Sequence, residues 1–113
     1  MTDPELDVLA RRVGEALAAR GLWLATAESC TGGWIAEAVT AIAGSSGWFD
    51  RGFVTYSNAA KADMLGVRGD TLDTHGAVSE ATVDEMATGV LARSRADLAR
   101  SEEHTSELQS RQY

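Results

Sequence analysis

Hydrophobic residues near the amino terminus recur at helical spacing. Leu6, Leu9, Val13 and Leu17 are separated by three, four and four residues, which places their side chains on one face of a helix. The preceding Asp3-Pro4-Glu5 combines an N-cap residue, a proline suited to the first helical position and an acid in the first turn. Because Gly21 is a typical helix end, the pattern predicts a helix from Asp3-Pro4 to Gly21.

Two short segments have the composition of β-strands. Residues 22–27 form a nearly continuous apolar run, which is typical of a strand covered on both faces. Residues 52–56 are rich in β-branched and aromatic types. Between the two segments, an apolar stripe predicts a helix from Gly32 to Ala43, and the glycines and serines of residues 44–47 predict a turn.

Helical patterns also follow the second predicted strand. Asn58 is a suitable N-cap for a short helix from Ala59 to Leu65, and residues 70–75 predict another brief helical turn. Ser79 precedes the last clear helix, whose apolar stripe contains Val83, Met86, Ala87, Val90 and Leu91. Strands that alternate with helices predict an α/β fold, a layered α/β/α domain with a largely parallel or mixed sheet.

Composition and charge narrow the functional classes. The chain has 113 residues, enough for one domain, and its 44% hydrophobic and 24% charged residues are ordinary for a soluble globular protein. A net charge of −7 disfavours nucleic acid as a partner. The sequence contains no apolar stretch of membrane-spanning length, no signal-peptide core and only one cysteine. We therefore expect a cytoplasmic protein that acts without nucleic acid or a membrane.

Polar side chains gather where the first predicted strand meets the next helix. Ser29, Cys30 and Thr31 come directly before Gly32 and Gly33. A helix that begins there would direct free N–H groups and the positive end of its dipole at the turn, which suits a phosphate or an oxyanion. Ser29 and Thr31 could equally be the N-cap residues of that helix, and the sequence leaves both interpretations open.

Lys61 is the single lysine in a chain with nine arginines. If Asn58 is the N-cap, Lys61 is the third residue of its helix, where the dipole disfavours a protonated amine. A lysine in such a place can act as a general base, whereas an arginine stays protonated. Tyr56 lies close enough in sequence to present its hydroxyl to the same space. The alternatives are a solvated lysine and a core aromatic residue.

Other catalytic chemistries are less well supported. Ser46, next to Ser45, lies in a turn of the kind that exposes a nucleophilic hydroxyl. Cys30 could be a nucleophile, but no histidine with an obvious base role accompanies it. Two histidines and one cysteine do not form a zinc pattern, and the Gly32-Gly33 turn matches neither common nucleotide-binding motif. We therefore expect neither a metal nor a cofactor.

Four motifs occur in order: AESCTGG at residues 27–33, AGSS at 43–46, RGFVTYSN at 51–58 with Lys61 three residues further on, and HGAVS at 75–79. Together they resemble the CinA C-terminal domain family, from about residue 3 to about residue 99. The resemblance implies hydrolysis of the nicotinamide mononucleotide carboxamide to nicotinate mononucleotide and ammonia, in an intact member that forms a homo-oligomer. It also implies catalytic roles for Ser46, Tyr56 and Lys61, with Ser29, Thr31, Gly32, Gly33 and Ser45 binding the substrate. A non-catalytic binding or regulatory module is the alternative.

The sequence changes character at Arg100. Residues 100–113 read RSEEHTSELQSRQY, lack apolar periodicity and resemble the translation of a sequencing-library adapter. We therefore expect residues 1–99 to be a partial domain and residues 100–113 to be a disordered, non-native tail. In the family, residues 96–99 open a further strand, so the chain is expected to stop where that strand begins, with its C-terminal part missing. An inactive fragment is a third possibility.

Overall fold

The computed structural model describes residues 4–103 of the chain. Along the chain, the elements are α1 (Pro4–Arg20), β1 (Leu24–Glu28), α2 (Trp34–Thr40), the 3-10 turn η1 (Ser45–Gly47), β2 (Phe49–Val54), α3 (Asn58–Leu65), α4 (Gly69–His75), α5 (Glu80–Ala92) and β3 (Leu98–Glu102).

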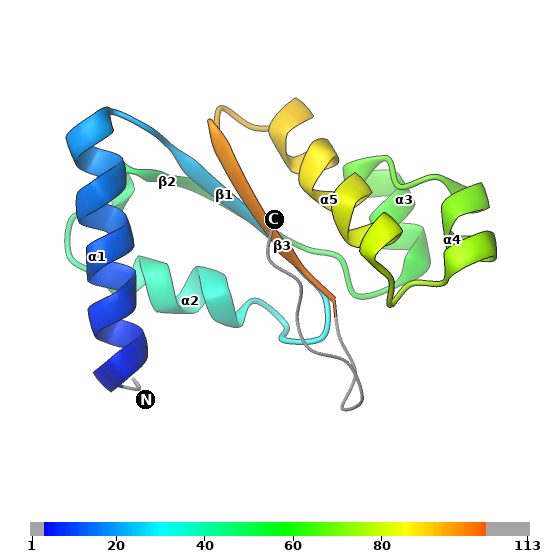
Figure 1. The fold of residues 1–113 in the computed structure, drawn as a ribbon, viewed down its shortest axis with the longest axis horizontal. Helices are drawn as coiled ribbons and strands as arrows, with labels where there is room; N and C mark the ends of the chain where they lie inside the picture. The colour runs from blue at the N-terminus through cyan, green and yellow to red at the C-terminus, as the bar shows by residue number, and fades with distance from the viewer. Residues whose placement is uncertain (1–3, 104–113) are drawn as a thin grey trace.

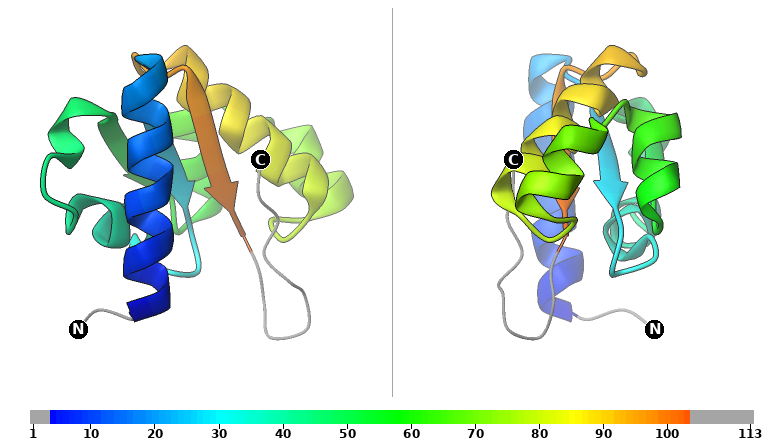
Figure 2. Two further views of the ribbon diagram at one scale, coloured as in Figure 1. Left: turned by 60° about the vertical axis from the view of Figure 1, so that its left-hand side comes forward. Right: turned by 90° about the vertical axis from the view of Figure 1, so that its right-hand side faces the viewer.

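The three strands form one parallel sheet in the order β2-β1-β3. Leu24 pairs with Phe49 on one side and with Leu98 on the other, and Glu28 pairs with Val54 and Glu102. All three strands therefore end at the same edge of the sheet. Helices α1 and α2 cover one face, and α3, α4 and α5 lie on the other (Figures 1 and 2). This arrangement confirms the predicted layered α/β class.

Each face of the sheet has its own hydrophobic cluster, and β1 contributes to both. Leu24 packs beneath α1 and α2 in a cluster that also contains Ala10, Leu17, Val39, Ile42 and Trp48. Ala25 and Ala27 point to the opposite face and pack with Leu65, Val67, Met86 and Val90. Successive side chains of a strand point to opposite faces, so the run of apolar residues in β1 serves two cores.

The predicted helices are present, but several boundaries differ. Helix α2 begins at Trp34 rather than at Gly32, because Gly32 and Gly33 have positive φ angles of 67° and 107°. Strand β2 begins at Phe49 rather than at residue 52, because its pairing with β1 starts there. The N-cap of α3 is Ser57 rather than Asn58, and the Ser57 side chain accepts the Ala60 N–H.

The start of the expected tail belongs to the fold. Arg100, Ser101 and Glu102 continue β3, and the Ser101 hydroxyl donates to the Val83 carbonyl at 2.8 Å. The expectation that the ordered chain ends before residue 100 is therefore wrong for residues 100–103. Backbone pairing with β1 explains the difference, since it does not need an apolar side-chain pattern. Residues 104–113 lie outside the described part of the chain, so the rest of the expectation stays a prediction.

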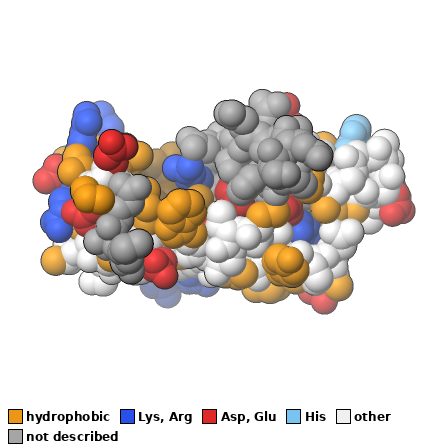
Figure 3. All heavy atoms as spheres, turned by 90° about the horizontal axis from the view of Figure 1, so that it is seen from below, with side chains coloured by type: hydrophobic (Ala, Val, Ile, Leu, Met, Phe, Trp, Pro, Cys, Tyr) orange, Lys and Arg blue, Asp and Glu red, His pale blue; other side chains and the backbone are white. Residues whose placement is uncertain are grey.

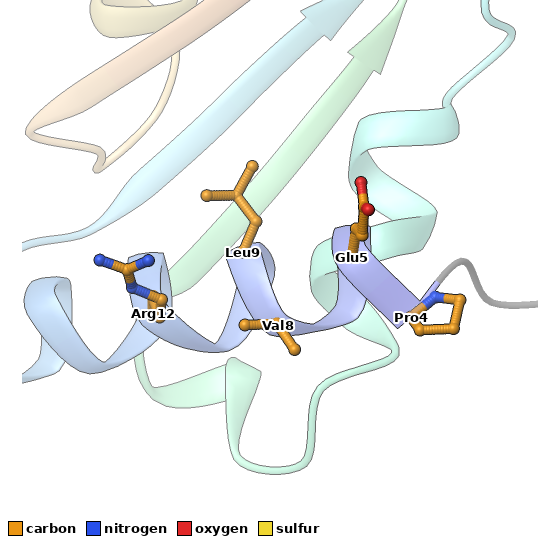
Figure 4. Close-up of a pocket in the computed structure, with 5 residues that line it drawn as sticks. All are labelled: Pro4, Glu5, Val8, Leu9 and Arg12. Carbon is orange, nitrogen blue, oxygen red and sulfur yellow. The ribbon is translucent and has the colours of Figure 1, made fainter.

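Apolar side chains remain exposed where α1 and α2 leave β3 partly uncovered. A groove of about 700 Å³ is lined by apolar residues of α1 and α2 and by Arg100 and Glu102 of β3. Leu9, Trp34 and Leu98 are among the exposed large hydrophobic residues, and Figure 3 shows hydrophobic patches on the lower face. A second hollow is formed by side chains of α1 alone, Pro4, Glu5, Val8, Leu9 and Arg12 (Figure 4). Within residues 4–103, no helix is both long enough and apolar enough to cross a membrane.

Candidate active site

Lys61 is buried at the edge where β1 and β2 end. Only 1% of its surface is exposed. Its Nζ donates to the Ser29 hydroxyl at 3.3 Å, to the Thr55 carbonyl at 3.1 Å and to the Tyr56 carbonyl at 3.5 Å. Burial of an amine is costly unless it is paired and hydrogen-bonded, and these contacts fix where the nitrogen lies. The interpretation of Lys61 as a solvated surface lysine is therefore wrong.

The ends of two strands bring Lys61 and Ser29 together. The Thr55 N–H donates to the Glu28 carbonyl at 2.9 Å, which extends the pairing of β1 and β2 by one residue. Ser29 follows β1 directly, and α3 begins three residues after Thr55. Lys61 is the fourth residue of α3, so its side chain reaches back along the first turn to Ser29.

A serine hydroxyl within reach of a lysine amine is a recognised catalytic arrangement. Ser29 is 2% exposed, and its Oγ is 3.3 Å from the Lys61 nitrogen. When the amine is neutral, it can take the hydroxyl proton and so activate the oxygen as a nucleophile. Of the hydroxyl side chains predicted to be catalytic or substrate-binding, Ser29 is the one whose oxygen contacts Lys61.

The end of α2 that was expected to bind an anion holds a carboxylate of the protein itself. Glu28 is 1% exposed, and its Oε1 accepts the Ile35 N–H at 2.6 Å and the Thr31 hydroxyl at 2.8 Å. Its Oε2 accepts the Ala36 N–H at 2.9 Å. Two free N–H groups of the helix start are thus used internally. These two N–H groups are therefore not available to a phosphate or an oxyanion in this conformation, and the role of residues 29–33 in substrate binding stays a prediction.

Ser45 and Ser46 lie at the opposite end of the sheet from Lys61. They belong to η1, which precedes β2, and the neighbouring Trp48 carbonyl accepts the Leu24 N–H at the start of β1. Five residue steps along β2 correspond to about 16 Å. Ser46 is exposed, whereas Ser45 is buried and its hydroxyl donates to the Thr40 carbonyl at 3.5 Å. Within one chain, Ser46 therefore cannot act together with Lys61, contrary to expectation.

The Tyr56 side chain also points away from the site. It is 77% exposed, and the contact between Tyr56 and Lys61 is made by the backbone carbonyl. The expectation that its hydroxyl faces the lysine is therefore wrong, as is the alternative of a core aromatic residue. The strand ends at Val54, and by Tyr56 the chain has already turned outward toward α3.

Glu103 closes the site from the side of β3. Its Oε2 is 2.9 Å from the Lys61 nitrogen, and its Oε1 accepts the Cys30 thiol at 2.9 Å. Glu103 is 5% exposed, so both partners of this ion pair are buried. Removal of one partner of such a pair leaves a buried charge without compensation. Glu103 belongs to the segment that the sequence predicts to be non-native.

A second charged group lies on the other face of β3. Burial lowers the pKa of Arg100, while the nearby carboxylates of Glu28 and Glu102 oppose that shift. Arg100 and Glu102 form part of the floor of the groove between α1 and α2. Among residues 4–103, no three histidine, cysteine or acidic side chains are grouped closely enough to hold a metal ion.

Sequence reasoning missed Glu28 and grouped Ser46 with Lys61, whereas the structure places the Ser29 hydroxyl against the lysine. Glu28 is the last residue of β1. Its carboxylate accepts N–H groups of α2, the next helix along the chain. The sequence signal was available: an acidic residue lies just before the turn that leads into a helix. Such a carboxylate can cap the N–H groups at the helix start.

Comparison with known proteins gives a consistent result. The family described as CinA C-terminal domain matches residues 6–102. Nicotinamide-nucleotide amidohydrolase PncC of Escherichia coli K12 is 65% identical over 99 residues, which are 88% of this chain and 60% of that protein. A CinA-like protein of Chloroherpeton thalassium is 58% identical over 91 residues, 80% of this chain and 22% of that protein. The chain thus spans about 60% of the length of the PncC proteins it matches.

Solved structures agree with the fold. The competence/damage inducible protein CihA from Agrobacterium tumefaciens superimposes with a TM-score of 0.88 at 49% sequence identity. That match covers 95% of this chain and 69% of the other. The competence damage-inducible protein A from Klebsiella pneumoniae gives a TM-score of 0.85 at 48% identity, covering 87% of this chain and 61% of the other.

Proposed function

The chain belongs to the CinA C-terminal domain family, and from this premise we propose that it is an amidohydrolase acting on nicotinamide mononucleotide. The products are nicotinate mononucleotide and ammonia. Its 65% identical relative, a nicotinamide-nucleotide amidohydrolase, supports this substrate class. The contact between the Lys61 amine and the Ser29 hydroxyl is the observation that carries the proposal, because it provides a base and a nucleophile in one place.

The first half of the proposed reaction forms an ester on Ser29. Neutral Lys61 takes the hydroxyl proton of Ser29 as the Ser29 oxygen attacks the carboxamide carbon. The tetrahedral intermediate then collapses, the carbon–nitrogen bond breaks, and the leaving nitrogen takes the proton from Lys61 to depart as ammonia. Ser29 replaces Ser46 in the nucleophilic role, since Ser29 is the serine that contacts the amine.

The second half of the reaction returns the enzyme to its starting state. Lys61 takes a proton from water, whose oxygen attacks the ester carbon. The bond to Ser29 breaks, and the proton passes from Lys61 to the Ser29 oxygen as the carboxylic acid leaves. Lys61 must be neutral at the start of each half. The amine must therefore leave its 2.9 Å contact with Glu103 during the cycle.

The test is ammonia release from nicotinamide mononucleotide by the 113-residue chain and its variants. We expect Ser29→Ala and Lys61→Ala each to lower kcat by at least about 10²-fold, the lower range for loss of a proton-transfer group. Ser46→Ala is the matched control, and it should change kcat less than about threefold because Ser46 is exposed at the far end of the sheet. Retained kcat with only a raised KM in Lys61→Ala would remove Lys61 as the base.

Two alternatives predict different results in the same assay. A non-catalytic binding or regulatory module would bind the nucleotide without releasing ammonia. An inactive fragment would do neither and would lack a cooperative melting transition.

Partners and location complete the proposal. We propose a homo-oligomer without a nucleic-acid partner, located in the cytoplasm. The net charge of −7 supports the absence of nucleic acid. Light scattering coupled to gel filtration measures the oligomeric state, and a purely monomeric chain would contradict that part of the proposal.

A further inference from the structure

Glu28 has a role that the proposed reaction does not yet use. We infer that Glu28 is a positioning residue that holds the Ser29 hydroxyl in register with Lys61, an inference that rests on the proposed amide hydrolysis. Glu28 does not contact Lys61, and it precedes Ser29 in the chain, so its side chain points to the opposite face of the sheet. It acts through the backbone that it fixes.

The three hydrogen bonds of Glu28 span the whole turn that carries Ser29. One goes to the Thr31 hydroxyl within the turn, and two go to the N–H groups of Ile35 and Ala36 in the first turn of α2. The carboxylate therefore joins the end of β1 to the start of α2 across eight residues. Ser29 lies inside the closed loop, next to the residue that closes it.

The turn contains two glycines, which favour conformational freedom. Gly32 and Gly33 both have positive φ angles, and glycine gains more freedom than any other residue when such a turn opens. The Gly32 N–H donates to the Ser29 carbonyl at 3.1 Å. The backbone of Ser29 is thus held by one bond within the turn and by the three bonds of its neighbour, Glu28.

The charge of Glu28 is compensated where it lies. It faces the positive end of α2, and the Arg100 guanidinium on β3 interacts with it electrostatically. The three hydrogen bonds that the buried carboxylate accepts fix its position. Replacing it with an amide puts an N–H donor against N–H donors of the helix, so at least one of the three bonds is lost.

The proposed role predicts which kinetic constant changes. The hydrogen bonds of Glu28 are made to the protein, so loss of Glu28 should leave substrate affinity nearly intact. Misplacement of a reacting group by about 1 Å can cost about 10²-fold in rate. We therefore expect a lower kcat with an almost unchanged KM. A residue that only stabilises the helix would instead lower the melting temperature and leave kcat unchanged well below the melt.

The experiment compares Glu28→Gln with Glu37→Gln in the full chain. Glu37 is an exposed acid in the first turn of the same helix and makes a matched control for loss of one negative charge. We measure kcat and KM for ammonia release from nicotinamide mononucleotide, and separately the rate at which phenylmethanesulfonyl fluoride labels Ser29, detected by mass spectrometry. We expect Glu28→Gln to lower kcat and the labelling rate by about 10–100-fold with KM changed less than threefold, and Glu37→Gln to match the unmodified chain.

Each outcome decides between the inference and the proposed function. Equal kcat and labelling rates in the two variants would overturn the role of Glu28. Labelling of Ser29 that depends on Glu28, without ammonia release by the unmodified chain, would support the inference and overturn the proposed substrate. An unmodified chain that neither labels nor reacts would overturn both. If Glu28→Gln does not melt cooperatively, Thr31→Val removes one of the three bonds and should give a smaller fall in both rates.

Discussion

At the scale of single residues, Glu85 shows how a carboxylate can connect two helices. Its side chain accepts the Arg68 N–H at 2.9 Å and the Thr71 hydroxyl, so a residue of α5 caps the start of α4. The backbone bond to Arg68 and the Thr71 hydroxyl hold the pKa of Glu85 below its ordinary value of about 4.5.

This shift predicts a pH-dependent contribution to stability. A depressed folded-state pKa stabilises the native state above the unfolded pKa, and the effect disappears as the pH falls through the folded value. We expect Glu85→Gln to lower the melting temperature at pH 7, and the difference from the unmodified chain to shrink below about pH 4.5. Thermal melts from pH 7 to pH 3 measure this. Asp84→Asn, which removes an exposed neighbouring carboxylate, should give a small difference at every pH, and a pH-independent deficit in Glu85→Gln would contradict the prediction.

The residues of the site were only partly predictable from sequence. Composition singled out Lys61, and the turn residues singled out Ser29. Grouping Ser46 with Lys61 did not consider which end of a strand each junction occupies. Ser29 and Lys61 follow β1 and β2, whereas Ser46 precedes β2. In a parallel sheet the carboxyl ends of strands meet at one edge, so this order alone could have separated them.

At the scale of elements, the packing of α3 against α5 depends on the absence of one side chain. A Cβ placed on Gly89 would lie 2.0 Å from the Leu65 carbonyl oxygen and 2.8 Å from its carbon. Both are backbone atoms, which cannot move without shifting the end of α3. The two helices can approach this closely only because residue 89 is glycine.

We therefore expect Gly89→Ala to lower the free energy of unfolding by about 2–3 kcal/mol, the upper range for overpacking of a core. The better helix propensity of alanine offsets less than half of this loss. Urea denaturation followed by circular dichroism measures the change. Gly69→Ala is the control, because no atom lies within 4 Å of its added Cβ and its φ is not positive. Equal stability of the two variants would contradict the prediction, because it would show that α3 can shift to accommodate the added methyl group.

Element types were easier to predict than element boundaries. The regular stripe of α1 and its start signals agree with the observed helix Pro4–Arg20. Strand β2 was placed three residues late because Asp50 and Arg51 do not look like strand residues. They are tolerated because β2 lies at the edge of the sheet, where polar side chains reach solvent. Tertiary pairing, rather than local propensity, sets this boundary.

At the scale of the whole molecule, β1 connects the two hydrophobic clusters. Leu24 belongs to one cluster and Ala25 and Ala27 to the other, and β1 lies between both remaining strands. Loss of either cluster exposes one face of the central strand. The two halves should therefore unfold together rather than one after the other.

We expect Leu17→Ala and Met86→Ala, one in each cluster, to shift a single unfolding transition to lower urea concentration. Each should lose about 2–5 kcal/mol, as is usual for a large buried side chain replaced by alanine. Circular dichroism and tryptophan fluorescence follow different parts of the molecule, so the two signals should coincide. Separate midpoints for the two signals, or a variant that shifts only one of them, would show that the clusters unfold independently.

The class of fold was predictable because helical and strand patterns alternate along most of the chain. The third strand was not predictable past residue 99, since Arg100, Ser101 and Glu102 have no apolar alternation. Their strand conformation comes from backbone bonds to β1 and from burial of Ser101 against α5. A sequence pattern reflects only the side chains. The end of β3 forms mainly through backbone hydrogen bonds, which leave no such pattern.

Ser29 and Lys61 are only 2% and 1% exposed, so a nucleotide cannot reach them in this conformation. In the proposed reaction, the site must therefore open before substrate binds, and the apparent affinity is reduced by the fraction of molecules that are open. In the proposed reaction, a change that loosens the Lys61–Glu103 contact would lower stability while freeing the Lys61 amine more often. Under the proposed reaction, a variant with a more stable closed site would have a lower kcat.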